Sequence, residues 1–311
     1  MKKIGVIYGG ISSERKISLK TGSAIADALR KEKFSVTLID SGKKDFINKL
    51  LASQIDFAFI ALHGPFGEDG TMQGLLEIFG IPYSGSGVLA SSLAMNKIFT
   101  KRIFDSSDIL TPKWQVVEGV QSSIRNLQFP VVVKPAKQGS AIGVTIVKAK
   151  SQLNKAIQNA LKYDNQAHHY AAGGQAIIED YIKGTEISVP ILGNEALPPI
   201  EIIPKNEFYD FYSKYSEGGS RHLIPPRLTR KIIDKAKKLG LAAHKSLGCQ
   251  VMSRVDMIVD KKSDIYVLEV NTIPGMTVTS LFPDSAKSAG YTFGGLLKKI
   301  IELSLNEKEQ S

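Results

Sequence analysis

The chain has 311 residues, of which 43% are hydrophobic and 23% charged, and this is typical of a globular protein with two or three domains. No apolar run reaches the roughly 20 residues needed to span a bilayer, and the N-terminus is typical of a strand rather than a signal peptide. The net charge of +10 comes from lysines spread along the chain, which does not indicate a nucleic-acid-binding protein. Cys249 is the only cysteine, so an internal disulfide is excluded. We therefore expect a cytoplasmic protein without a membrane or nucleic-acid partner.

The first part of the chain alternates predicted strands and helices. The pattern predicts strands at 4–8, 35–40 and 57–62, a helix at 12–33 and a short helix between the second and third strands. This β-α-β-α-β order predicts a doubly wound parallel sheet, in which ligands bind at the carboxyl ends of the strands. Two polar loops, 9–15 and 63–70, lie at those ends. We assign residues 1–91 to this α/β domain.

Residues 92–183 are predicted to form a small central α+β domain. A helix at 88–105 leads into it, and the pattern inside it predicts strands at 129–135, 144–147 and 176–182 and a helix at 151–162. Lys134 ends the first of these strands, beside a loop with Gly139 and Ser140. A strand-end lysine and flexible backbone N–H groups suit phosphate binding, although a lysine there could also extend to the surface.

Residues 184–311 form the third predicted domain, with strands at 186–192, 197–203, 251–260 and 265–271 that are typical of an antiparallel sheet. A loop rich in tyrosine, glycine and serine, 208–219, suggests a cover over a site. This loop contains Lys214, which could contact a phosphate or could be solvated.

The last two predicted strands bring hard oxygen ligands together. Asp256 lies on the first strand, whereas Glu269 and Asn271 lie two residues apart on the second and so face the same side. These side chains suit Mg²⁺ better than a soft metal, and the turn at 274–275 can expose backbone amides. The alternative is an exposed hairpin whose acids are solvated.

Several common catalytic motifs are absent from the sequence. It has no Walker-type phosphate loop, no nucleophile elbow and no His-Glu-x-x-His zinc motif. A nucleotide and magnesium site spread over separate segments remains. His63 follows a strand and precedes a glycine, so it is either a site residue or a core histidine, and Lys97 on the helix after Asn96 is a weaker phosphate candidate.

Six segments together match one known family. They are Gly9-Gly10-Ile-Ser-Ser-Glu14-Arg15-Lys-Ile-Ser18, Ala61-Leu-His63 through Glu68-Asp69-Gly70 to Gly74, Tyr83-Ser-Gly85-Ser86-Gly87-Val88, Val133-Lys134-Pro135 with Gly139-Ser140, Tyr209 through Lys214-Tyr215, and Arg254-Val-Asp256 through Glu269-Val-Asn271 to Thr277. Over essentially its whole length the chain resembles the D-alanine–D-alanine ligases of the ATP-grasp superfamily. The resemblance implies a three-domain ATP-grasp architecture. It also implies that ATP phosphorylates the carboxylate of one D-alanine, and that the amine of a second attacks the acyl phosphate to give D-alanyl-D-alanine for peptidoglycan precursors.

The resemblance also implies roles in nucleotide and metal binding. Two Mg²⁺ or Mn²⁺ ions would be held by Asp256, Glu269 and Asn271. Phosphates would be contacted by Lys97, Lys134 and Lys214. Glu179 would lie by the adenine and Glu186 by the ribose hydroxyls.

For the amino-acid substrates, the resemblance implies that Glu14 holds the ammonium of the first D-alanine and connects with Ser140 and Tyr215. Arg254 and the amide of Gly275 would stabilise the tetrahedral oxyanion. Ser280 and the amide of Leu281 would bind the carboxylate of the second D-alanine, and His63 would lie near that subsite. A homodimer is also implied.

Two other functions agree less well with the sequence. An ATP-grasp ligase with different substrates would need changes at Glu14, Ser280 or Tyr215, and these residues are unchanged. A nucleotide-binding regulator without activity would lack some of the predicted metal and phosphate residues, and all of these are present. Tyr215 favours an amine over a D-lactate acceptor, because the related D-lactate ligases have a different residue there. Asp180 and Ala141 stand where a lysine and a serine are common in the family, so we do not expect the usual lysine contact to adenine or the second loop hydroxyl.

Overall fold

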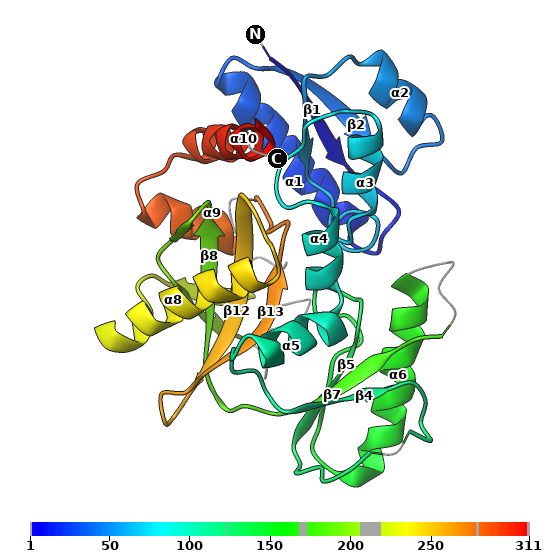
Figure 1. Cartoon of the computed structure of the whole chain (residues 1–311), viewed down its shortest axis with the longest axis vertical. Helices are drawn as coiled ribbons and strands as arrows, with labels where there is room; N and C mark the ends of the chain where they lie inside the picture. Colours follow the sequence, from blue (N-terminus) through cyan, green and yellow to red (C-terminus); the bar gives the residue numbers. More distant parts are fainter. Residues whose placement is uncertain (1, 123, 168–172, 206–218, 278–279, 310–311) are drawn as a thin grey trace.

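The computed structural model describes residues 2–309 except 123, 168–172, 206–218 and 278–279. It shows three sheets, formed in turn by the first, middle and last parts of the chain, with helices packed around each (Figure 1). The predicted combination of α/β and α+β architecture is therefore confirmed, whereas the domain boundaries after residues 91 and 183 stay predictions.

The first sheet is parallel, with strand order β2-β1-β3. Its elements are β1 (Lys3–Tyr8), α1 (Arg15–Lys31), β2 (Ser35–Asp40), α2 (Phe46–Ala52), β3 (Phe57–Ile60) and α3 (Thr71–Ile78). Alternation along β1 sends Ile4 and Val6 into one core with Leu29 of α1, and Ile7 into another with Leu50 of α2 and Leu76 of α3. Helices thus cover both faces, as the doubly wound prediction requires.

The end of the chain returns to this first sheet. Helix α9 (Leu281–Ser288) leads to α10 (Phe293–Glu309), which packs beside α1 (Figure 1). Leu297 and Ile300 of α10 share a core with Ile4 and Leu29. The last predicted domain therefore contributes part of the first domain's core, a contact that the local sequence pattern did not indicate.

The single helix predicted at 88–105 is wrong, because the chain forms two helices there. These are α4 (Val88–Met95) and α5 (Lys97–Ser106). Asn96 between them is extended, with ψ of 101°, and its side chain accepts a hydrogen bond from Ile98 N at 3.1 Å, so it caps α5. The backbone N–H of Lys97 donates to Ala136 O at 2.9 Å, which ties the start of α5 to the middle sheet.

The middle sheet is antiparallel and has the order β4-β7-β5-β6. Its elements are β4 (Trp114–Val117), β5 (Val131–Pro135), β6 (Thr145–Val147), the 3-10 turn η1 (Lys150–Gln152), α6 (Leu153–Ala167) and β7 (Ala176–Asp180). Val131 and Val133 of β5 pack with Ile157 and Ala160 of α6 on one face. Lys134 comes directly after Val133 in the strand and therefore faces the other side, toward the third sheet.

The third sheet has the order β11-β10-β8-β12-β13, with β9 paired to β8, and its pairs are antiparallel as predicted. Its elements are β8 (Gly184–Leu192), β9 (Glu195–Ala196), β10 (Ile200–Pro204), β11 (Ser220–Leu223), α8 (Arg230–Ser246), β12 (Met252–Asp260) and β13 (Ile265–Asn271). Helix α8 covers one face, where Cys249 is buried in the same core. Among the helices of the described residues, none has the length and apolar character needed to cross a membrane.

Candidate active site

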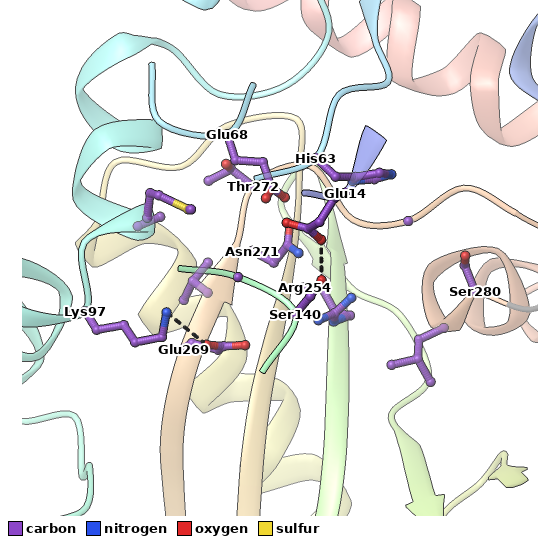
Figure 2. Close-up of a pocket in the computed structure, with 16 residues that line it drawn as sticks. Glu14, His63, Glu68, Lys97, Ser140, Arg254, Glu269, Asn271, Thr272 and Ser280 are labelled. Carbon is purple, nitrogen blue, oxygen red and sulfur yellow. Dashed lines mark hydrogen bonds and ion pairs between the residues drawn. The ribbon is translucent and has the colours of Figure 1, made fainter. Parts of the chain in front are cut away.

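A pocket lies where the three sheets approach one another, and every part of the chain contributes to it (Figure 2). Its polar lining includes Glu14, Glu68, Lys97, Ser140, Arg254 and Glu269. Figure 2 shows Glu14 and Ser140 joined across the pocket, with Lys97 and Glu269 on one side and Ser280 on the other. Residues distant in sequence therefore meet in one polar cavity.

The strand pair β12–β13 forms one wall of this pocket. In its antiparallel register Arg254 pairs with Asn271 and Asp256 with Glu269, so all four belong to one short stretch of the ladder. The register shifts at a bulge directly after Asp256. The guanidinium of Arg254 donates to both carboxylate oxygens of Asp256, with the shortest distance 2.7 Å.

The proposed metal ligands have the right donor chemistry. Asp256 also accepts from Ser188 Oγ at 2.7 Å, Glu269 lies 3.7 Å from Lys97 Nζ, and Asn271 Oδ1 accepts from the backbone of Ile273. Within the described part of the chain, no three acidic, histidine or cysteine side chains converge as a ready-made metal cluster. Two carboxylates and an amide oxygen on adjacent strands still fit a hard divalent cation, and Lys97 and Arg254 balance the acids in this structure.

The loop after β5 crosses the mouth of the pocket. Ser140 and Ala141 both have left-handed backbones, with φ of 53° and 57°, which turns successive N–H groups toward one side. Asp164 of α6 fixes the base of the loop by accepting from the backbone of Lys137 at 2.7 Å. The hydroxyl of Ser140 donates to Glu14 Oε1, which joins the loop to the start of α1.

A second cavity, a slot between the middle and third sheets, adjoins the pocket. Lys134, Glu179 and Glu186 line it. Lys97 and Glu269 line both the slot and the pocket, so the two cavities meet at these residues.

Glu179 is the most enclosed acid of the slot. Lys134 Nζ lies 2.6 Å from Glu179 Oε1 and Lys101 Nζ lies 2.9 Å from Glu179 Oε2. Burial alone would raise the pKa of Glu179, but the charges of Lys101 and Lys134 outweigh burial and hold this pKa below its ordinary value. The carboxylate is therefore ionised in the folded protein.

The opposite end of the pocket is formed by the start of α9. Ser280 precedes the first turn, and its hydroxyl oxygen accepts from the backbone of Thr277 at 3.0 Å. A Cβ added at Gly275 would lie 2.9 Å from Ser280 Oγ, so a side chain there would displace Ser280. The exposed N–H groups of a helix start favour a negative group such as a carboxylate.

Comparison with known proteins places this geometry in a family. A model described as D-ala D-ala ligase N-terminus matches residues 43–86, and one described as D-ala D-ala ligase C-terminus matches residues 104–302. A D-alanine–D-alanine ligase from Carboxydothermus hydrogenoformans is 46% identical over 321 residues, which cover 99% of this chain and 100% of that relative. The chain belongs to the D-alanine–D-alanine ligase family.

Further relatives agree with this assignment. A D-alanine–D-alanine ligase from Geotalea uraniireducens is 46% identical, with 96% of this chain and 94% of that protein covered. The crystal structure of the Bacillus anthracis D-alanine–D-alanine ligase complexed with ATP superposes with a TM-score of 0.84 at 38% identity, and each chain is fully covered. The ATP-grasp fold expected from the sequence is thus confirmed.

The structure brings together most of the residues predicted for this family. The pocket is lined by Glu14, His63, Lys97, Ser140, Arg254, Glu269, Asn271, Gly275, Ser280 and Leu281. The slot is lined by Lys97, Lys134, Glu179, Glu186, Asp256 and Glu269. Lys214 and Tyr215 lie outside the described residues, so their predicted roles stay predictions.

His63 borders the pocket but also has structural bonds. Its Nε2 lies 3.0 Å from the hydroxyl of Thr21, and the ring also bonds to the backbone of Ile273. Burial and the charge of Arg254 lower the pKa of His63 to about 4, so the ring is neutral near pH 7. A neutral ring can shape the second-substrate end of the pocket without adding charge.

Two residues of the site were missed by the sequence interpretation. Glu68 is buried in the pocket, and its Oε2 accepts from the backbone of Gly64 at 2.6 Å. Burial and the charge of Glu14 raise the pKa of Glu68 well above its ordinary value. The other missed residue is Lys101, whose spacing of four from Lys97 was the available signal, since it places both on one helix face.

Proposed function

We propose that this protein is an ATP-dependent ligase that joins two D-alanines into D-alanyl-D-alanine for peptidoglycan precursor synthesis, with ADP and phosphate as the other products. The observation that carries the proposal is the junction at Lys97 and Glu269, which line both the polar pocket and the slot. A phosphoryl group held at this junction reaches a carboxylate in the pocket. Full-length similarity to D-alanine–D-alanine ligases supports this substrate class.

The first D-alanine binds with its ammonium at Glu14, whose carboxylate is fixed by Ser140. Glu68 lies in the same pocket and adds a second carboxyl group near the ammonium. Tyr215, in the loop 208–219 that is predicted to cover the site, completes this connection, as the family resemblance implies. This arrangement leaves the substrate carboxylate facing Lys97 and Arg254, which offset its charge and that of the incoming phosphoryl group.

Phosphoryl transfer occurs at the junction of pocket and slot. A carboxylate oxygen of D-alanine forms a bond to the γ-phosphorus, the bond from that phosphorus to the β-γ bridging oxygen breaks, and ADP leaves. Lys97, Lys134 and Lys214 offset the phosphate charge during this transfer. Two Mg²⁺ or Mn²⁺ ions, held by Asp256, Glu269 and Asn271, would supply further neutralisation of phosphate charge when bound.

The second D-alanine binds at the α9 end of the pocket. Its carboxylate accepts hydrogen bonds from the hydroxyl of Ser280 and the backbone amide of Leu281, and His63 borders this subsite. After its ammonium has released a proton to solvent, its amine attacks the acyl carbon. The bond between this carbon and the phosphate oxygen then breaks, phosphate leaves with the electron pair, and the nitrogen releases a second proton to solvent to give the amide. Arg254 and the amide of Gly275 stabilise the oxyanion that forms in between.

The nucleotide base and ribose occupy the slot. Glu179 accepts from the amino group of the adenine, and Glu186 accepts from the ribose hydroxyls. Asp180, the last residue of β7, and Tyr181 directly after it also line this space and border the base.

The protein acts in the cytoplasm as a homodimer. The supporting surface is an apolar hollow of the first domain with Ile11 and Ile78 on its lining, which are 61% and 81% exposed. Sedimentation of the wild type should give the mass of two chains. Ile78→Asp should reduce it to one chain, and a wild-type monomer at micromolar concentration would refute the dimer.

The proposed reaction is tested by phosphate release from Mg²⁺-ATP with D-alanine as the only amino acid, followed by mass identification of the product. One dipeptide per phosphate is the expected result. If the protein turns over only with another amino acid or a hydroxy acid, D-alanine is not its substrate. If it hydrolyses no ATP with any acceptor, the proposed ligase activity is refuted.

A further inference from the structure

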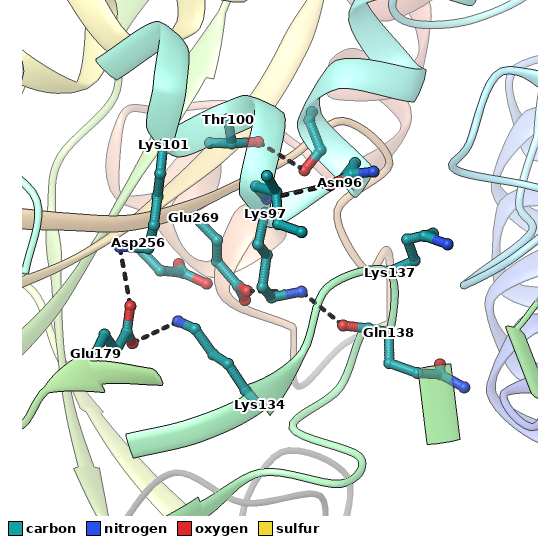
Figure 3. Close-up of polar contacts among 12 residues, drawn as sticks. Asn96, Lys97, Thr100, Lys101, Lys134, Lys137, Gln138, Glu179, Asp256 and Glu269 are labelled. Atoms are coloured by element: carbon teal, nitrogen blue, oxygen red, sulfur yellow. Dashed lines mark hydrogen bonds and ion pairs between the residues drawn. The ribbon is translucent and has the colours of Figure 1, made fainter. Parts of the chain in front are cut away.

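Helix α5 carries two buried lysines one turn apart, of which Lys97 lines the pocket and the slot and Lys101 lies behind the slot (Figure 3). Lys97 donates to Gln138 O at 2.6 Å and lies near Glu269, at the phosphate end of the slot. Lys101 is 0% exposed and points instead at Glu179. A fully buried lysine is rare unless it is paired, so its partners indicate its purpose.

The contacts of Lys101 connect the two sheets that enclose the slot. Its Nζ lies 2.9 Å from Glu179 Oε2 on β7 and donates to the hydroxyl of Thr111 at 2.6 Å. The Thr111 hydroxyl in turn donates to Val267 O on β13 at 2.9 Å. Lys101 is not among the described residues that line the slot, so it acts on a nucleotide only through Glu179.

Lys134 differs from Lys101 in its access to the slot. It is also paired with Glu179, but it borders the open cavity, where phosphates would attract it. If Lys134 turns to a phosphate, Lys101 becomes the one close cation left for Glu179 among the described residues. A buried carboxylate without a cation would take up a proton.

Glu179 also has bonding capacity left for a ligand. Its Oε2 is buried against Lys101, whereas its Oε1 pairs with Lys134 of the slot lining and is left for a ligand when Lys134 turns to a phosphate. An ionised carboxylate oxygen accepts hydrogen bonds and cannot donate one. It therefore favours a base with an amino group and repels a base that presents a carbonyl oxygen at the same position.

We infer that Lys101 is a positioning residue that keeps Glu179 ionised and oriented while Lys134 serves the phosphates, and that this pair selects a 6-amino purine over a 6-oxo purine. The inference rests on the proposed function, since it places the base at Glu179. Adenine donates from its 6-amino group, whereas guanine presents an oxygen there. Lys101 thus contributes to nucleotide selectivity without touching the nucleotide.

The test compares ATP with GTP as phosphoryl donor in the full-length protein at saturating D-alanine. Lys101→Met should lower kcat/KM for ATP roughly 30-fold, mainly through KM, and reduce the ATP-to-GTP preference about tenfold. The reason is that the buried carboxylate of Glu179 would lose its cation and its orientation toward the base. KM for D-alanine should not change. Lys101→Arg should restore part of the preference, and Arg102→Met, on the exposed side of the same helix, is the matched control.

The pH profile separates positioning from simple packing. Without Lys101, Glu179 should take up a proton at low pH, so the ATP preference of Lys101→Met should be weak at pH 6 and recover toward pH 9. The wild-type preference should stay constant over that range. An equal loss with ATP and GTP, with no pH dependence, would overturn the inference and make Lys101 a structural residue only.

Two further measurements keep the outcomes distinct. If Lys101→Met does not fold, the substitution is made together with Glu179→Gln, which removes the buried charge. In that background the ATP-to-GTP ratio should match that of Glu179→Gln alone, and a further additive loss would contradict the coupling. Equilibrium binding of ADP and GDP gives the same ratio without D-alanine, so a failed ligase assay does not decide this inference.

Discussion

Glu68 and Glu179 are both buried carboxyl groups beside joined cavities, yet their pKa values move in opposite directions. Burial and the nearby charge of Glu14 raise the pKa of Glu68. Burial acts on Glu179 in the same sense, but Lys101 and Lys134 reverse it. The amino-acid pocket thus holds acids that await a cation from the substrate, whereas the nucleotide slot brings its own cations. Neighbouring charges thus decide whether a buried glutamate is held ionised before a ligand binds.

The largest effect is expected in the pocket that awaits a cation. Glu14→Gln should lower kcat/KM for D-alanine about 10³-fold, because the ammonium would lose its charged partner in a buried site. KM for ATP should change little, since Glu14 does not line the slot. Steady-state phosphate release measures both values. Asp27→Asn on the exposed face of α1 is the control, and an equal loss in the two variants would exclude a specific role for Glu14.

In the slot, removal of the acid should destabilise the fold. Glu179→Gln leaves Lys101 buried opposite a neutral group, so the free energy of unfolding should fall by about 3 kcal/mol near pH 7. Urea unfolding measures this change. A more stable Glu179→Gln variant would mean that desolvation of the acid outweighs its two ion pairs, which would remove the contrast with Glu68.

At the α9 end, Gly275→Ala should lower kcat about 10²-fold, because the new Cβ would lie 2.9 Å from Ser280 Oγ and disturb the oxyanion and carboxylate contacts. Gly119→Ala is the matched control, since a Cβ there meets nothing within 4 Å. The thermal unfolding temperature should stay within a few degrees for both. Normal turnover by Gly275→Ala would show that this turn does not contact the reacting atoms.

The smallest effect, for a change of one pH unit, is expected at Glu68. Because its folded pKa is raised, its contribution to stability is present below the ordinary glutamate value of about 4.3 and is lost as pH rises through the folded pKa. Glu68→Gln resembles the protonated acid and should remove this loss, which amounts to at most about 1.4 kcal/mol per pH unit. Urea midpoints from pH 5 to pH 9 measure it. Glu195→Gln, at an exposed position on β9, should keep the wild-type slope, and a Glu68→Gln slope equal to it would contradict the raised pKa.

The sequence predicted well the features that depend on local pattern. Alternation along 251–260 and 265–271 predicted the strand pair, and two-residue spacing placed Glu269 and Asn271 on one side. Family motifs then predicted Glu14 and Ser140 as partners, although 126 residues separate them. Such a contact between distant segments was accessible only through the resemblance.

Features that depend on tertiary contacts were missed. The break at Asn96 arises because its side chain caps α5 while Lys97 N bonds to the middle sheet, and neither contact leaves a periodic signal. In the sequence alone Lys101 cannot be told from a lysine on the protein surface. Only the position of Glu179 on β7 explains why Lys101 is buried. The return of α10 to the first sheet likewise depends on shape rather than on local pattern.

The most direct test of the proposed chemistry follows an oxygen atom. D-Alanine labelled with ¹⁸O in both carboxylate positions is turned over with Mg²⁺-ATP, and the released phosphate is analysed by mass. Because phosphate should leave with an oxygen of the first D-alanine, one ¹⁸O per dipeptide should appear in phosphate. Dipeptide formation with unlabelled phosphate would contradict an acyl phosphate at the junction of Lys97 and Glu269.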